Sequence, residues 1–370
     1  MAITLSATRN RHVEFVASVP LDLINAMYFI ALAQGLEGLD DWPVSTRDRI
    51  DAGLRYDLDL LVAFPHGEAG LIGSLNDAMF VHRETWGGIE DLLRFVRELP
   101  AGGTGNLEKP GIQGLAYYAL RYPCDTPFDL GGGAPSRDDV VRSLEANGDL
   151  PGGVSRSDAM RLFDEPEQTR ARLLTLIRRF YDEHYRPDQE RRIACMERSV
   201  AAHRRDTAMD PEELSRRLSR RSMTCLESVC AGEHREYIFV PSVDVGPYNS
   251  CVNLPDLHAL YYPCEREYQG VPAAEADATH RMALVYRALG DEQRLRILGL
   301  LRGGELYVQE IVERTGLHQS VVSRHLSFMK AVGLVNARRQ NNMKYYSLNS
   351  DAGGELRRAV DAFLPEPAAR

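Results

Sequence analysis

The spacing of apolar residues predicts that the first two thirds of the chain are mainly helical. Residues 89–99 place five apolar side chains on one face of a helix: Ile89, Leu92, Leu93, Val96 and Leu99. Similar apolar stretches predict further helices over residues 21–36, 168–184, 189–204 and 211–229. These elements are long enough to enclose a core of their own.

Short runs rich in β-branched and aromatic residues add a small sheet to this region. They occupy residues 12–17, 235–240, 248–253 and 257–262, and the segment from Pro241 to Pro247 is typical of a turn. Residues 1–270 are therefore predicted to be an α+β domain, mainly helical with a small antiparallel sheet. A small and polar stretch with Gly270 and Pro272 predicts a linker over residues 271–279, and residues 280–370 are predicted to be a second domain.

The second domain has the pattern of a winged helix-turn-helix. One helix ends at Gly290, and Asp291 can cap the next, whose core-facing residues are predicted to be Leu295, Ile297, Leu298 and Leu301. A short helix over residues 308–314 and the turn Thr315-Gly316 precede a helix over residues 319–332. Its inward positions are predicted to be Val322, Leu326 and Met329. Residues 334–348 then predict a β-hairpin, the wing, with Asn341 and Asn342 at its turn.

Small polar and basic residues on this helix and wing predict a surface for double-stranded DNA. The predicted DNA-binding residues are Gln319, Ser320, Ser323, Arg324, His325, Arg338, Arg339 and Lys344. Long side chains on a recognition helix can reach base edges, whereas a basic wing contacts the phosphate backbone. The alternative, a winged helix used for protein contacts, would be expected to expose apolar residues at these positions.

The charge distribution agrees with this division. The chain has a formal net charge of −9, yet residues 280–350 carry 11 Lys and Arg against 5 Asp and Glu. Association with a polyanion depends on the local field more than on the total charge. A basic module attached to an acidic body therefore suits a DNA-binding protein.

Four segments of the module resemble the ArsR family of winged-helix repressors. They are residues 288–298 (ALGDEQRLRIL), 322–326 (VSRHL), 332–335 (VGLV) and 346–348 (YSL). The resemblance implies a homodimer that binds a short inverted repeat. It also implies that the dimer forms through residues 281–289 (Arg281 to Leu289) and residues 355–364 (Glu355 to Leu364).

The chain departs from that family at its metal-binding positions. Tyr307 and Gln309 stand where many members have cysteines, and the C-terminal helix has Asp361 but no histidine. A phenol and an amide are poor ligands for soft metals. We therefore expect no metal site in the module and no cofactor, and we expect any effector to act through residues 1–270.

Two similar strings in the N-terminal region are candidates for an effector site. Residues 122–125 and 262–265 share a Tyr-Pro-Cys-acid sequence, which includes Tyr122, Cys124, Tyr262 and Cys264. The two cysteines could form a thiol sensor or bind a soft metal, and the tyrosines could line a pocket for a planar ligand. Equally, the strings could coincide by chance in two loops, and the tyrosines could be core residues.

The remaining motifs favour a regulator over an enzyme. The sequence has no GxxxxGK[ST], GxGxxG opening a helix, HExxH or GxSxG motif, and its six cysteines lack zinc-binding spacing. It starts with no secretory signal and has no stretch that could span a membrane, so we expect a cytoplasmic protein. The alternative function is a DNA-tethered enzyme or assembly module whose activity lies in residues 1–270.

Overall fold

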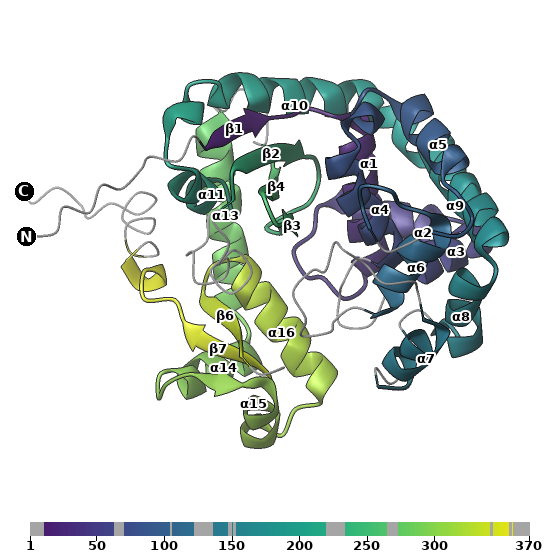
Figure 1. Ribbon diagram of the computed structural model, residues 1–370. Coiled ribbons are helices and arrows are strands. Elements are labelled where there is room, and N and C mark those ends of the chain that lie inside the picture. Colours follow the sequence, from purple (N-terminus) through teal and green to yellow (C-terminus); the bar gives the residue numbers. More distant parts are fainter. Residues whose placement is uncertain are drawn as a thin grey trace, which may run out of the picture.

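The computed structural model shows a mainly helical α+β protein with two small sheets in separate parts of the molecule (Figure 1). It describes residues 11–62, 70–103, 106–121, 136–146, 150, 153–219, 234–264, 273–340, 343–354 and 357. The first sheet and helices α1 to α11 form the N-terminal part, and the winged helix lies below it, with α13 running between the two.

Most of the predicted N-terminal helices are present within a few residues of their expected bounds. The longer ones are α1 (Val19–Leu32), α9 (Pro166–Phe180) and α10 (Gln189–His203). A single π-helical turn over Tyr181–Tyr185 follows α9. The other helices are α2 (Asp41–Arg49), α3 (Ala52–Val62), α4 (Gly70–Val81), α5 (Ile89–Glu98), α6 (Ile112–Arg121), α7 (Arg137–Ala146), α8 (Arg156–Asp164) and α11 (Pro211–Ser219).

The N-terminal sheet is mixed, so the prediction of an antiparallel sheet is wrong. Its strands β1 (His12–Phe15), β2 (Glu236–Ser242), β3 (Ser250–Leu254) and β4 (Leu257–Pro263) lie in the order β1-β2-β4-β3. The β1–β2 and β2–β4 pairs are parallel, and only β3–β4 is antiparallel. The reason is that β4 lies between β2 and β3. Periodicity within each strand does not encode that arrangement.

Strand β2 also continues through Pro241, where a turn was predicted. Proline has no N–H to donate to a neighbouring strand. Val16 N donates to Phe239 O, while Cys264 N donates to Ser242 O on the β4 side. Pro241 therefore faces the β1 side at a position beyond the end of β1, where no donor is required.

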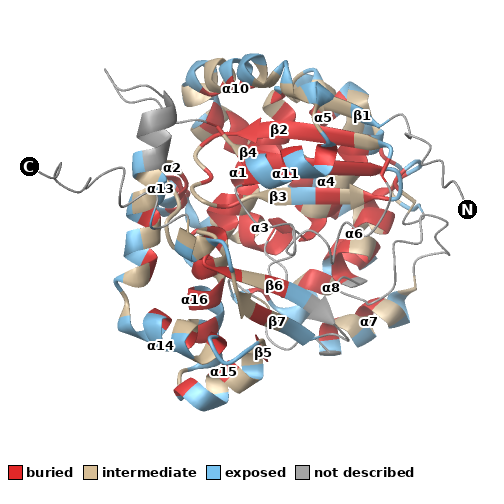
Figure 2. Cartoon of the chain, turned by 90° about the vertical axis from the view of Figure 1, so that its left-hand side faces the viewer, coloured by how far each residue is buried: buried red, intermediate tan, exposed pale blue. Residues whose placement is uncertain are grey.

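The two faces of the sheet are covered by different helices. Alternate residues Ile238, Val240, Ala259 and Tyr261 belong to the large core that includes α1 and α4. The intervening side chains pack with α11 residues Leu214 and Leu218; they are Tyr237, Phe239, Leu260 and Tyr262. Strands β2 and β4 are accordingly buried along nearly their whole length (Figure 2).

The winged helix contains the predicted elements. They are α13 (Ala273–Leu289), α14 (Glu292–Leu301), β5 (Leu306–Tyr307), α15 (Val308–Thr315), α16 (Gln319–Ala331), β6 (Val335–Gln340) and β7 (Met343–Leu348). The second sheet is antiparallel in the order β5-β7-β6. The predicted linker is wrong from Ala273 onward, because α13 already begins there. Four alanines between residues 273 and 278 favour that helix. Apart from Arg357, the predicted helix over residues 355–364 lies outside the described residues.

Among the helices of the described ranges, none combines the length and apolar character needed to cross a bilayer.

A buried histidine on β4 makes the sheet sensitive to acid. His258 is 2% exposed, and its Nδ1 lies 2.7 Å from Asn253 Oδ1 on β3. The His234 ring lies 5.9 Å away, centroid to centroid. Burial, and secondarily the neighbouring His234, lowers the pKa of His258 to about 4. The folded state therefore keeps this imidazole neutral.

We predict that His258 destabilises the protein progressively as the pH falls from about 6.5 to about 4. In the unfolded chain the His258 imidazole takes up a proton near pH 6.5, whereas in the folded chain it stays neutral until about pH 4. Across this range the free energy of unfolding falls by about 3 kcal/mol. The free energy of unfolding, measured with urea at several pH values in this range, should depend less steeply on pH in His258→Gln than in the wild type. His12→Gln, at an exposed position on β1, is the matched control. Equal slopes in all three proteins would contradict the prediction.

Candidate nucleic-acid interface

Helix α16 is positioned by a tight turn and an apolar inner face. Gly316 ends α15 in the left-handed conformation, with φ of 71°. The His318 side chain caps the start of α16 by accepting a hydrogen bond from Ser320 N. Val322, Leu326 and Met329 are fully buried, as predicted. These contacts fix the rotation of α16 about its axis and therefore determine which residues it presents to solvent.

The exposed side of α16 contains four of the five residues predicted on this helix to bind DNA. Gln319, Ser320, Ser323 and Arg324 are all exposed and lie in its first half. His325 is an exception, because it is 5% exposed and its Nε2 lies 2.9 Å from Gln293 Oε1. It follows Val322 by three residues and so shares the inward face. Burial lowers the pKa of His325 below its usual value, which leaves a neutral ring in the core.

The wing presents basic side chains, one of which is already paired. Arg338 forms a bidentate ion pair with Glu305, and its guanidinium lies 4.9 Å from the Tyr345 ring centroid. Lys344 is exposed, with its ammonium 5.7 Å from the Tyr346 ring centroid. Arg339 lies opposite Lys344 in the hairpin, but its side chain is outside the described set, as are Asn341 and Asn342.

The start of α14 differs from the prediction in a way that matters for the whole molecule. Leu295, predicted to face the core, is 49% exposed, whereas Arg294 is buried. Arg294 donates from Nε to Ala288 O and from Nη2 to Arg287 O, at 2.9 and 2.7 Å. It thereby satisfies two carbonyls at the end of α13. Its Nη1 lies 2.7 Å from Glu37 Oε2, on the N-terminal part.

Glu37 belongs to an interdomain segment, residues 36–40, that packs against the winged helix. Gly38 has a φ of +82°, and a Cβ added to it would lie 2.6 Å from Phe328 Cε2 on α16. The Tyr248 hydroxyl donates to Glu37 O at 2.7 Å, and Tyr248 also packs in a cluster with Ala331. The N-terminal part therefore contacts the second half of α16, next to the exposed first half.

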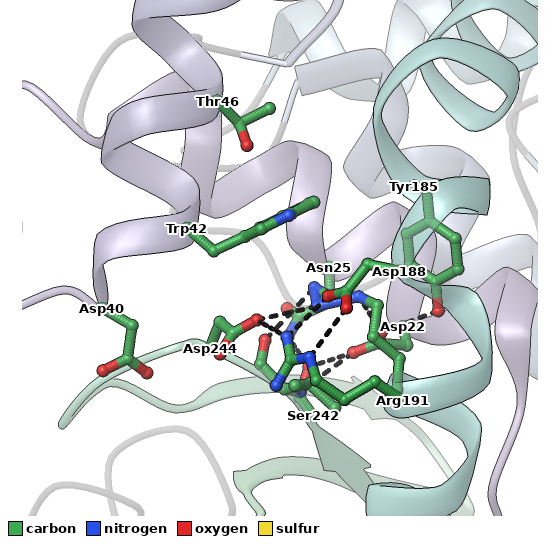
Figure 3. Close-up of polar contacts among 12 residues, drawn as sticks. Asp22, Asn25, Asp40, Trp42, Thr46, Tyr185, Asp188, Arg191, Ser242 and Asp244 are labelled. Atoms are coloured by element: carbon green, nitrogen blue, oxygen red, sulfur yellow. Dashed lines mark hydrogen bonds and ion pairs between the residues drawn. The ribbon is translucent and has the colours of Figure 1, made fainter.

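A buried polar cluster lies behind the interdomain segment. Arg192 is 0% exposed; its Nη1 lies 3.2 Å from Asp244 Oδ2 and its Nε 3.4 Å from Asp22 Oδ2. Its guanidinium stacks 4.2 Å from the Trp42 ring centroid, and the Tyr185 hydroxyl donates to Asp22 Oδ2 at 2.8 Å. Figure 3 shows Asp22 and Asp244 gathered below Trp42. The cluster joins α1, α2, α10 and the end of β2.

The cluster continues into the turn between β2 and β3, residues 243–249. Asp22 Oδ1 accepts hydrogen bonds from Ser242 Oγ and Val243 N, at 3.0 and 3.1 Å. Asp244 adopts a φ of 61°, and Gly246 N donates to Asp40 Oδ2 at 3.1 Å. Because Asp40 belongs to the interdomain segment, one continuous set of contacts runs from Arg192 to α16.

The predicted effector residues are only partly placed. Tyr122 and Cys124 lie outside the described residues. Tyr262 is buried, with its hydroxyl 3.0 Å from Ser199 Oγ, and the thiol that contacts Cys264 belongs to Cys195 on α10. Within the described ranges, no three His, Cys, Asp or Glu residues form a group that could hold a metal.

Sequence reasoning did not identify Glu37, Gly38 or Arg192. Arg192 follows Arg191 in a helix with many charged residues, and nothing in the local pattern marks it as buried. Gly38 is one of 30 glycines in the chain. Their partners come from distant segments, so no spacing rule could have connected them.

Known proteins resemble the C-terminal module. The family model for bacterial regulatory proteins of the arsR family matches residues 291–337. The transcriptional activator HlyU of Vibrio cholerae is 37% identical over 70 residues, which cover 19% of this chain and 65% of HlyU. The chain therefore spans slightly less than two thirds of that relative.

Two further relatives are matched over more of their length. The HTH-type transcriptional regulator MJ1325 of Methanocaldococcus jannaschii is 33% identical over 82 residues, which cover 22% of this chain and 92% of MJ1325. The transcriptional repressor SdpR of Bacillus subtilis is 33% identical over 66 residues, which cover 18% of this chain and 73% of SdpR.

We predict that Arg192→Met destabilises the N-terminal part by about 3–5 kcal/mol, because it leaves the buried carboxylates without their cation. Arg191→Met is the matched control. Its side chain is 51% exposed and pairs with Asp188 and Asp244, so about 1 kcal/mol or less is expected. Urea unfolding followed by circular dichroism measures both. Similar losses in the two variants would contradict a special role for the buried arginine.

We also predict that Gly38→Ala weakens the packing of the interdomain segment against α16 by about 1–3 kcal/mol. The added methyl group would clash with Phe328, and alanine would be strained in the left-handed backbone conformation of this position. Amide hydrogen exchange in the second half of α16 should accelerate, while exchange in α4 stays unchanged. Gly35→Ala is the control, because its added Cβ meets only Leu32 O, at 3.6 Å. Unchanged exchange in α16 of Gly38→Ala would show that the contact does not restrain the helix.

Proposed function

Because the chain belongs to the bacterial arsR family of regulatory proteins, we propose that it is a sequence-specific transcriptional regulator. Its relatives include both an activator, HlyU, and a repressor, SdpR, and we propose repression, as in SdpR. The observation that carries the proposal is the first half of α16. It exposes four polar and basic residues on one side, while the opposite side of the helix is fully buried.

Each exposed residue has a role in this proposal that follows from its chemistry. Gln319 and Arg324 are long enough to hydrogen-bond base edges in the major groove. Ser320 and Ser323 allow close approach and can donate to phosphates. Arg339 and Lys344 of the wing contact the backbone, and Arg338 exchanges its bond to Glu305 for a phosphate.

The proposed functional unit is a homodimer on a short inverted repeat. Three large apolar side chains of the module are exposed: Tyr286 on α13 at 46%, Leu295 on α14 at 49% and Met343 on β7 at 41%. We propose that a second copy covers Tyr286 and Leu295 and also contacts residues 355–364. Two-fold symmetry would then place two copies of α16 about 34 Å apart, one turn of DNA.

We further propose that residues 1–270 are the regulatory domain and residues 280–370 the DNA-binding domain. Support comes from the contacts that connect them, namely Glu37 with Arg294 and Gly38 with Phe328. A shift of the interdomain segment would act directly on α14 and α16. An effector that favours one position of this segment could thereby change DNA affinity without touching DNA.

We predict different effects from changes in α16 and in the wing. The probe is a set of duplexes recovered from genomic fragments that the full-length protein retains. Arg324→Ala should weaken binding to the preferred duplex by about 1–3 kcal/mol and reduce discrimination between duplexes. Replacing Arg338, Arg339 and Lys344 together by Gln should weaken binding to all duplexes. It should also reduce the magnitude of the slope of log affinity against log salt concentration by about 2–3.

Fluorescence anisotropy at several salt concentrations measures both quantities. Arg142→Gln on α7 is the control, because it removes one exposed arginine from the N-terminal part. The proposal would fail if the triple wing variant bound the selected duplexes with wild-type affinity and salt dependence.

A further inference from the structure

Two cysteines from distant parts of the chain meet where the N-terminal part ends. Cys195 lies on α10, and Cys264 directly follows β4. The two thiols contact each other in a cluster with Met196 and Val243. Neither cysteine is in a disulfide; Cys264 is buried and Cys195 is partly accessible. This is a pair of thiols in contact, one buried and the other partly exposed to solvent.

The surroundings give the two thiols different reactivities. A hydrogen bond from Cys264, supported by the nearby guanidinium groups of Arg198 and Arg191, lowers the pKa of Cys195. The same hydrogen bond, together with burial, raises the pKa of Cys264 well above its ordinary value. The accessible thiol is therefore the one more readily ionised, which is the form that reacts with oxidants.

We propose that Cys195 and Cys264 form a reversible disulfide that switches the DNA-binding module, an inference that rests on the proposed regulatory function. The oxidant class is a peroxide. The Cys195 thiolate attacks hydrogen peroxide to give a sulfenic acid and hydroxide. The Cys264 thiol then attacks that sulfur, which forms the S–S bond. Its proton and the departing hydroxyl leave as water, so two thiols and one peroxide yield one disulfide and two waters.

The position of the pair explains how the bond would reach the DNA-binding module. Cys264 N donates to Ser242 O, and Val243 of the same cluster donates from its backbone to Asp22. The following turn holds the interdomain segment through Gly246 and Asp40. A new covalent bond at Cys264 would therefore act on the turn that supports the contact with α16.

Cys264 also stands at the start of the connection to α13. Residues 265–272 are all that separate it from the first residue of that helix, Ala273. A bond from Cys264 to α10 would therefore anchor the chain close in sequence to the start of α13. Both routes lead to the module, so the disulfide would change its placement relative to the N-terminal part.

The experiment oxidises the full-length protein with hydrogen peroxide and maps its disulfides by mass spectrometry after alkylation. The principal cross-linked peptide should join Cys195 to Cys264. Affinity for the selected duplex should change about 5-fold or more and return on treatment with dithiothreitol. Hydrogen exchange in α16 should change in the same step, with or without DNA.

Three variants give the controls. Cys195→Ser and Cys264→Ala should lose the response, whereas Cys251→Ala, at an exposed cysteine on β3, should keep it. Absence of the Cys195–Cys264 peptide in the folded wild type would overturn the inference. So would a disulfide that leaves both affinity and α16 exchange unchanged. If the reduced wild type fails to prefer any duplex, the proposed function fails instead, and α16 exchange still decides whether the thiols control the module.

Discussion

The packing of α1, α2, α10 and the β2–β3 turn against one another depends on the burial of one guanidinium, that of Arg192. A cation removed from water is tolerated only where opposite charges and hydrogen-bonding partners compensate for its lost hydration. Here Asp22 and Asp244 supply the charge, and Trp42 and Tyr185 supply aromatic faces. Because these partners come from separate elements, satisfying Arg192 fixes α1, α2, α10 and the β2–β3 turn together.

A second buried arginine, Arg294, is likewise paired with a carboxylate, at the junction with the winged helix. Arg294 binds two carbonyls at the end of α13 and the carboxylate of Glu37. The two arginines are connected through the β2–β3 turn and the interdomain segment. Polar contacts of this kind have strict geometric requirements, so they favour defined positions over a continuous range. This makes the junction suited to transmitting a displacement.

The N-terminal part and the module differ in charge, because the chain is acidic as a whole whereas the module is basic. In the proposed function the exposed basic residues of α16 and the wing attract DNA, whereas Arg294 of α14 is paired with Glu37 and Arg338 of the wing is paired with Glu305. Such pairing moderates nonspecific attraction to phosphates. In the proposed function, sequence discrimination then falls to exposed residues such as Arg324.

The sequence by itself determined the winged helix, because that module is built from local signals. Apolar spacing placed Val322, Leu326 and Met329 inside, and Gly316 marked the turn between the two helices. The same reasoning located the four N-terminal strands and the helices α1, α5, α9, α10 and α11, but not α2 to α4 or α6 to α8. It failed for His325 and Arg294, which are buried against partners in other segments, and for Leu295, which is exposed instead of buried. Only the tertiary structure decided the strand order, the burial of Arg192 and the meeting of Cys195 with Cys264. Each of these joins residues far apart in the chain, and hydrophobic periodicity carries no information about which distant segments will pack together.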